Sequence, residues 1–291
     1  MIKILQSGDE AMLERFLLPR LETSMFLISN LRQVGLVDRG RPYEGTYAAA
    51  FKGDTMSGVV AHYWNQMLIF QAPDRANELW PVAVKASQRP IGGLLGPAEQ
   101  VETVEAALGI DPENIQLDST DKLYSLALAD LIVPAALHNG ELRARRIKAD
   151  DLALMIDWRV AYAIETLGAE ESAALHDESR RSIERTFEEG LLWLLEKEGQ
   201  PVATTAFNAA IAEGVQVGGV WTPPALRGRG YGRAVVAASL LAAREQGGQT
   251  AILFTDEHNF PAQKAYTALG FREIGNYRLL LLKQPLTHRE Q

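Results

Sequence analysis

The chain has 291 residues, of which 47% are hydrophobic and 23% charged, and its formal net charge is -8. These values are typical of a soluble globular protein with one or two domains, and the negative charge argues against nucleic acid or an anionic membrane as a partner. There are no cysteines, which excludes disulfides, thiolate zinc sites and a catalytic thiol. No apolar run is typical of a signal peptide or a membrane span. We therefore expect a cytoplasmic protein, monomeric or homodimeric, without a metal.

Hydrophobic periodicity and turn residues predict a mixed α/β segment in the N-terminal half. Its expected strands are 2–5, 46–51, 58–62, 67–71, 91–95 and 123–129, and its expected helices are 9–17, 24–33, 77–87 and 98–108.

The C-terminal half predicts the same order more clearly. Its expected strands are 141–148, 191–195, 202–207, 215–222, 251–254 and 277–282, and its expected helices are 152–168, 171–189, 230–245 and 262–269. The repeated order predicts two copies of one α/β fold, each a mixed sheet with flanking helices. The predicted domains are 1–137 and 138–291, joined near 134–140.

A glycine-rich loop follows the expected strand 215–222. Its sequence is Arg227-Gly228-Arg229-Gly230-Tyr231-Gly232, with Arg233 next, and a helix begins there. Free amides at a helix start bind anions, glycines let the backbone approach a phosphate, and arginines add positive charge. The spacing matches neither the NTPase nor the dinucleotide-binding loop. The corresponding place in the first copy has only Gln71-Ala72-Pro73-Asp74-Arg75. The first copy is therefore predicted to lack an anion site.

These residues resemble the GCN5-related N-acetyltransferase (GNAT) family. The loop fits that family's motif Arg/Gln-x-x-Gly-x-Gly/Ala, and Val220-Trp221-Thr222-Pro223-Pro224 precedes it as the family requires. A second motif follows in Asn259-Phe260-Pro261-Ala262, Tyr266 and Gly270-Phe271. The resemblance covers about residues 142–282, and the first half is similar in element order only, as a degenerate copy without cofactor. It implies two tandem GNAT-like acyl-CoA N-acyltransferase folds.

The resemblance also implies a reaction, in which an acyl group, acetyl by family frequency, moves directly from acetyl-CoA to an amine of a small molecule or protein. The strand carrying Val220, Trp221 and Thr222 would diverge from its neighbour and pair with the pantetheine arm. Tyr266 would be the general acid for the departing thiolate. Asn259 would bind the cofactor arm or cap a helix. The implied cofactor-binding set is Val220, Trp221, Thr222, Arg227, Gly228, Arg229, Gly230, Tyr231, Gly232, Arg233, Asn259, Ala262 and Tyr266.

The general base and the acceptor are not identified by the sequence. Some relatives have a glutamate six residues before the position of Thr222, where this chain has Gln216. Candidate bases are Glu213, Asp256, Glu257, His258, Glu165 and His176. Residues that could line the acceptor cleft between the domains are Trp158, Arg159, Tyr162, Glu165 and Arg180. The alternatives to an N-acyltransferase are a non-catalytic acyl-CoA sensor and a nucleotide-binding enzyme of another class.

Overall fold

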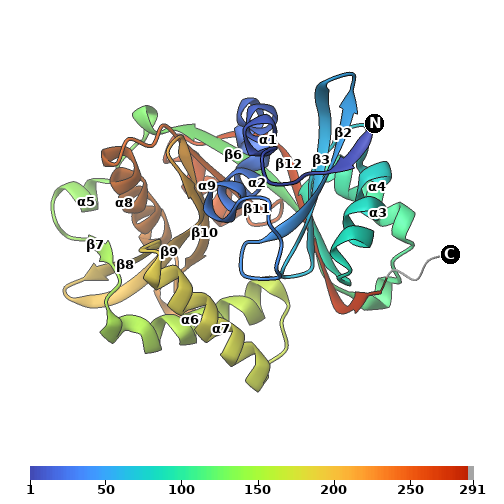
Figure 1. Ribbon diagram of the computed structural model, residues 1–291. Helices are drawn as coiled ribbons and strands as arrows, with labels where there is room; N and C mark the ends of the chain where they lie inside the picture. The colour runs from blue at the N-terminus through green and yellow to red at the C-terminus, as the bar shows by residue number, and fades with distance from the viewer. Residues whose placement is uncertain (288–291) are drawn as a thin grey trace. The chain divides into compact units, whose positions relative to one another are not determined.

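The computed structural model describes residues 1–287 and divides into two compact units. Among the described residues, the N-terminal unit contains Met1–Lys122 together with 275–287, and the C-terminal unit is Leu123–Ile274. Figure 1 shows strands flanked by helices in each unit. Each unit has the predicted mixed sheet, which confirms the α/β class.

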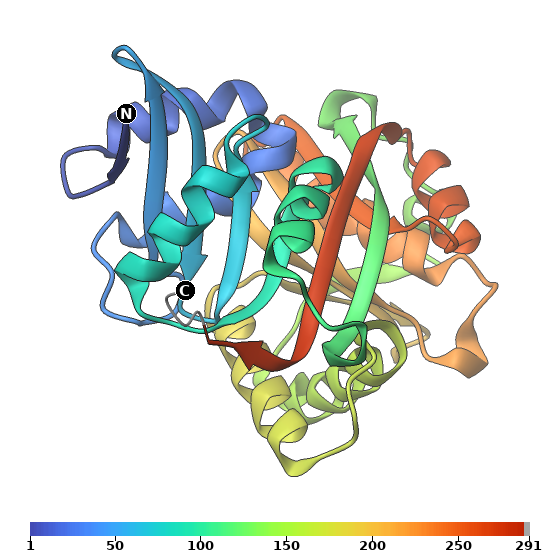
Figure 2. The same ribbon diagram turned by 90° about the vertical axis from the view of Figure 1, so that its right-hand side faces the viewer.

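The N-terminal unit has the strand order β1-β2-β3-β4-β5-β12-β6. Its strands are β1 (Ile2–Ile4), β2 (Gly45–Lys52), β3 (Thr55–Tyr63), β4 (Met67–Gln71), β5 (Ile91–Pro97), β6 (Ile115–Ala127) and β12 (Arg272–Leu286). Its helices are α1 (Glu10–Leu17), α2 (Leu21–Val34), α3 (Ala76–Ser87) and α4 (Ala98–Leu108). Figure 2 shows α3 and α4 on the viewer's side of the strands of this unit.

The C-terminal unit continues from β6 in the order β6-β11-β10-β9-β8-β7. Its strands are β7 (Arg143–Arg146), β8 (Leu192–Lys197), β9 (Gln200–Ile211), β10 (Gly214–Trp221) and β11 (Thr250–Asp256). Its helices are α5 (Ala135–His138), α6 (Leu152–Leu167), α7 (Ala173–Glu188), α8 (Tyr231–Glu245) and α9 (Phe260–Thr267). Figure 1 shows α6 and α7 on the opposite side of these strands from α8.

Alternation along β8 explains why this sheet carries helices on both faces. Trp193 and Leu195 belong to the core that contains α8, whereas Leu192 and Leu194 belong to the core of α6 and α7. Side chains in a strand point alternately to the two faces, so a continuous apolar run requires cover on both. The run at 191–195 was predicted as a buried strand for this reason.

Two long strands each continue from one unit into the other. The sequence predicted that residues 123–129 close the N-terminal sheet, but there β12 is the strand that pairs with β5, with Leu280 opposite Leu94. Residues from Leu123 onward instead belong to the C-terminal unit, where the Leu128 amide donates to Gln249. Burial of Leu280 and Leu128, both 0% exposed, accounts for the arrangement. The predicted domain boundary between residues 137 and 138 separates the two copies expected from the sequence, and it stays a prediction.

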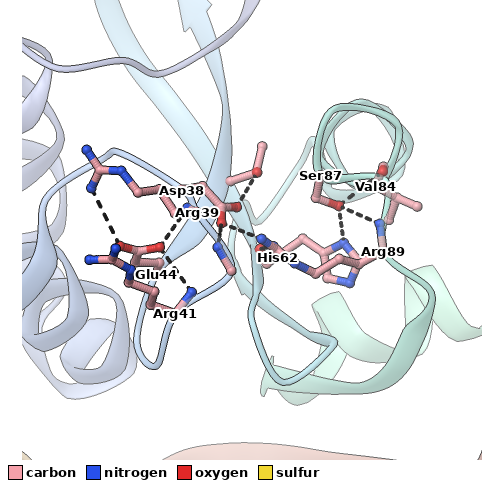
Figure 3. Close-up of polar contacts among 10 residues, drawn as sticks. Asp38, Arg39, Arg41, Glu44, His62, Val84, Ser87 and Arg89 are labelled. Carbon is pink, nitrogen blue, oxygen red and sulfur yellow. Dashed lines mark hydrogen bonds and ion pairs between the residues drawn. The ribbon is translucent and has the colours of Figure 1, made fainter.

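A buried polar cluster connects loop, strand and helix of the N-terminal unit (Figure 3). His62 on β3 is 0% exposed, and its ring bonds Ser87 Oγ at 2.7 Å and the Pro90 carbonyl at 3.2 Å. Arg89 donates to the His62 carbonyl at 3.1 Å and pairs with Asp38. Burial, followed by the positive charge of Arg89, lowers the pKa of His62 to about 4. His62 is therefore neutral in the fold at neutral pH.

Candidate functional site

Strands β10 and β11 diverge at the middle of the C-terminal sheet. They pair in parallel only from Gly214 opposite Thr250 to Gln216 opposite Ile252. Both strands continue beyond this pairing, β10 to Trp221 and β11 to Asp256. Within residues 1–287, no strand pairs with the β11-facing edge of β10 after Gln216. The divergence leaves a strand edge on which an extended ligand can pair with the backbone.

The glycine-rich loop connects this strand to α8. Gly228 and Gly230 have φ of 77° and 78°, a left-handed conformation that glycine adopts without strain. A Cβ at Gly228 would meet nothing within 4 Å, so the space beside that backbone is open. Gly232 lies at the first turn of α8, where a Cβ would be 3.5 Å from Thr222 Oγ1. The loop therefore starts α8 directly beside the end of β10.

The backbone amides at this helix start have no acceptor within residues 1–287. No hydrogen bond is recorded for the amide of any residue from Gly228 to Arg233 in the part of the chain that is described, whereas the Ala234 amide begins the helical pattern by bonding Gly230 at 3.0 Å. Unpaired amides together with the helix dipole attract an anion. Arg229 and Arg233 are exposed and form no ion pair within residues 1–287. The predicted anion site is thus available to a ligand.

Arg227 has a different environment from the other two loop arginines. Its Nε donates to the Thr222 carbonyl at 3.0 Å, and its guanidinium lies 5.0 Å from the centre of the Trp221 ring. Its Nη1 forms an ion pair of 2.8 Å with Glu165 of α6. The sequence did not predict this pair, because 62 positions separate the two residues.

Tyr266 lies in the core beside the divergent strands. It is 8% exposed, and its ring centre lies 6.5 Å from that of Tyr124 and 6.0 Å from that of Phe271. Burial, followed by the nearby Tyr162, raises the pKa of the Tyr266 phenol. A tyrosine that keeps its proton at neutral pH has the protonation state that a general acid requires.

Asn259 caps the helix that carries Tyr266. Its side-chain oxygen accepts from the Ala262 amide at 3.2 Å, and Pro261 follows in the first turn. This is the usual geometry of an N-cap. Of the two predicted roles, helix capping is therefore observed, and cofactor contact by Asn259 and Ala262 stays a prediction.

Residues 153–271 match the acetyltransferase (GNAT) family. These residues form a GNAT domain. The match contains the divergent strands, the glycine-rich loop and Tyr266, and it confirms the resemblance stated from the two motifs. It supports N-acyltransferase chemistry in general and the use of acetyl-CoA. No curated protein matches the chain in sequence.

Solved structures extend the similarity from the GNAT domain to the whole chain. A Drosophila protein has a TM-score of 0.67 at 15% identity, over 97% of this chain and 98% of its own. A GCN5-related N-acetyltransferase from Sphaerobacter thermophilus has a TM-score of 0.60 at 13% identity, over 98% and 96%. A tandem GNAT protein from the clavulanic acid biosynthesis pathway has a TM-score of 0.55 at 14% identity, over 98% and 99%. At these identities the likeness concerns the fold, which is that of two tandem GNAT-like copies.

The matching place in the N-terminal unit is occupied by its own side chains. Strands β4 and β5 pair only from Met67 to Ile69, as in the second copy. Beyond that, the Ala72 amide donates to Gln100 Oε1 at 2.7 Å. At the start of α3, the carboxylate of Glu78 pairs with Arg75 at 2.5 Å, so this arginine already has a counter-ion within the unit. That this unit binds no cofactor stays a prediction.

The candidate bases of the GNAT domain are dispersed. Glu165 is paired with Arg227, and His176 bonds Glu171 at 2.6 Å on the exposed surface. His258 lies 3.5 Å from Asp256 and is exposed. Glu213 and Glu257 lie in turns, where their carbonyls accept hydrogen bonds from the Thr250 amide and from Gln263. Gln216 is 1% exposed and carries no charge, so the strand position supplies no base.

Two further features concern the part of the chain that the structure describes. No cluster of His, Asp and Glu in it has the arrangement of a metal site. None of its helices combines the length and the apolar character needed to cross a membrane.

Proposed function

We propose that the GNAT domain transfers an acetyl group from acetyl-CoA directly to an amine of a small molecule or protein. The observation that carries the proposal is the combination, in one unit, of a strand edge without a partner and a helix start with unpaired amides. The first suits the amides and carbonyls of a pantetheine arm, and the second suits a diphosphate. Coenzyme A carries both groups on one chain.

In this reaction the amine nitrogen attacks the thioester carbonyl carbon. A C–N bond forms and the C–S bond breaks, which gives an amide and a thiolate. Backbone N–H groups near Trp221 and Thr222 polarise the carbonyl, and Tyr266 donates its proton to the thiolate. The attacking nitrogen releases one proton to solvent as the amide forms, and Tyr266 regains its own proton from solvent. The amine loses its proton to bulk water before it binds, which requires no dedicated base and is consistent with a neutral Gln216.

The N-terminal unit has no cofactor in this proposal, because Gln100 and Glu78 occupy the relevant places. A cytoplasmic location and a monomeric or homodimeric state stay predictions. The second candidate is a non-catalytic acetyl-CoA sensor, which the uncharged Gln216 favours.

The test combines calorimetry with a thioester-cleavage assay. The protein should bind acetyl-CoA and coenzyme A but neither ATP nor NAD, and it should release free coenzyme A in the presence of at least some amines of a broad panel. Binding without release on any amine would support the sensor. Preference for ATP or NAD would exclude both candidates.

A matched pair of variants tests the phosphate loop itself. Gly230 is the N-cap of α8 at positive φ, a conformation that Asn and Asp tolerate better than other residues. Gly230→Asp should reduce acetyl-CoA affinity about 100-fold, because it places a carboxylate at the phosphate site. Gly230→Asn has nearly the same shape without the charge and should lose much less affinity. Equal affinities of the two variants would refute the loop assignment.

A further inference from the structure

Three side chains of α6 lie at increasing distances from the glycine-rich loop. Arg159, Tyr162 and Glu165 recur every three residues, so each is a neighbour of the next on the surface of the helix. Glu165 contacts the loop through Arg227, and the Tyr162 ring lies 6.3 Å from that of Trp221. The Arg159 guanidinium lies 5.3 Å from the Tyr162 ring. Because a helix rises about 1.5 Å per residue, Arg159 lies about 9 Å along α6 from Glu165. Arg159 is thus separated from the phosphate loop by Tyr162.

Two buried hydrogen-bond donors next to Tyr162 have no acceptor among the residues that the structure describes. Nη1 of Arg159 and Nε1 of Trp221 are both inaccessible to solvent, and neither has a partner within residues 1–287. A buried donor without an acceptor is destabilising, more so when it is charged, and such groups are rare in folded proteins. A ligand that supplies acceptor oxygens would remove this cost, and an anion would also neutralise the guanidinium.

Gln216 contributes an unpaired acceptor on the same side of the sheet. Its neighbours Val215 and Val217 belong to the core of α8, so alternation directs Gln216 toward α6 and α7. It is 1% exposed, and its Oε1 has no partner among the described residues. An N–H group of an amine could satisfy this oxygen. A neutral glutamine does so without repelling a negatively charged ligand, as a buried glutamate would.

We propose that the acceptor of this domain is an amine that also carries an anionic group, a carboxylate or a phosphate, and that Arg159 binds that group. This inference rests on the proposed transferase function and narrows its substrate class. Arg159 suits the role because a guanidinium binds planar or tetrahedral oxyanions through paired N–H donors. The position of Arg159 beyond Tyr162, away from the phosphate loop, separates the acceptor's anion from the phosphates of coenzyme A.

The experiment measures binding of matched ligands to the full-length protein saturated with coenzyme A. One arm compares amino acids, with the carboxylate at different distances from the amine, against their carboxamides. A second arm compares phosphoethanolamine with ethanolamine, which separates phosphate from carboxylate recognition. Calorimetry reports binding without turnover, so acceptor recognition is measured even if the transferase reaction fails. If the wild-type protein does not bind coenzyme A, that result would instead count against the proposed function.

The variants Arg159→Gln, Arg159→Lys and Arg181→Gln identify the residue responsible. Arg159→Gln should weaken binding of the anionic amine about 10- to 100-fold and leave coenzyme A affinity unchanged. Arg159→Lys keeps the charge and should retain part of the affinity. Arg181 is an exposed arginine of α7, so Arg181→Gln should behave as wild type. If no anionic amine binds better than its neutral counterpart, or if Arg159→Gln does not change the preference, the proposal is overturned.

Discussion

The carboxylate of Glu165 lies 2.8 Å from Nη1 of Arg227 and thereby links α6 to the glycine-rich loop. Both side chains are about half exposed, at 48% and 44%. An ion pair this exposed contributes about 0–1 kcal/mol, so a polyanionic ligand can replace it at small cost. The pair therefore holds Arg227 in place without preventing it from turning to a phosphate.

Replacement of Glu165 by glutamine should tighten coenzyme A binding. The substitution removes a negative charge beside the loop and frees Arg227, and the gain should be up to about fivefold, the equivalent of about 1 kcal/mol. Titration calorimetry at low and high salt measures it, and the gain should shrink as salt rises. Asp157→Asn, at an exposed position of the same helix, is the matched control. If Glu165→Gln binds coenzyme A more weakly than wild type, the ion pair between Glu165 and Arg227 is needed to hold the loop in its binding conformation.

Replacement of Tyr266 by phenylalanine should lower kcat about 100-fold with little change in coenzyme A affinity. The loss follows from the removal of a general acid, whose contribution is commonly about 100-fold or more. The pKa of Tyr266 is raised, so Tyr266 should keep its proton up to about pH 10. The wild-type rate should therefore show no decrease from ionisation of Tyr266 at any pH below that value. Tyr124→Phe, which alters the aromatic neighbour, should keep most of the activity. If Tyr266→Phe has the wild-type rate, the proton for the thiolate comes from water and not from Tyr266.

Substitutions at Asn259 separate its capping role from cofactor contact. Asn259→Ala should destabilise the protein by about 1 kcal/mol, because the Ala262 amide loses its acceptor. Asn259→Asp keeps an oxygen in the same place and should keep the stability, as measured by denaturant unfolding. Should Asn259→Asp be as stable as wild type yet bind coenzyme A far more weakly, Asn259 contacts the cofactor as well.

Acidification should destabilise the protein through His62. Its pKa is about 4 in the fold against an ordinary value of 6.5. Between these pH values the unfolded state binds the proton and the folded state does not, so stability falls as pH decreases. The full effect, reached at the folded pKa, is about 3 kcal/mol. Denaturant unfolding at about pH 7 and about pH 5 measures the slope.

The variant His62→Gln assigns that slope to one side chain. Glutamine can still donate to the Pro90 carbonyl but does not titrate, so the stability of this variant should depend less on pH in the same window. His258→Gln removes a histidine that is 78% exposed and should leave the slope unchanged. Parallel slopes for wild type and His62→Gln would show that His62 accepts its proton within the fold.

Local features of the chain were readable without the structure. The periodicity of α8 and the apolar run of β8 lie within a few residues of their predicted bounds, because each depends on neighbours in sequence. The glycine-rich loop was readable for the same reason, since strand, glycines and helix start are contiguous. The strands with which β6 and β12 pair could not be predicted from the sequence. Residues 123–129 and 277–282 are both apolar, and only long-range packing distinguishes their partners.

The sequence by itself determined the elements, their repeated order and the chemistry of the loop from Arg227 to Arg233, because all of these are encoded over short stretches of chain. Only the tertiary structure decided that β10 leaves β11 after Gln216, that Arg227 pairs with Glu165, and that Arg159 and Trp221 have buried donors without acceptors. The physical reason is that divergence, ion pairing and burial depend on atoms that lie far apart in the chain and meet only when the core is packed.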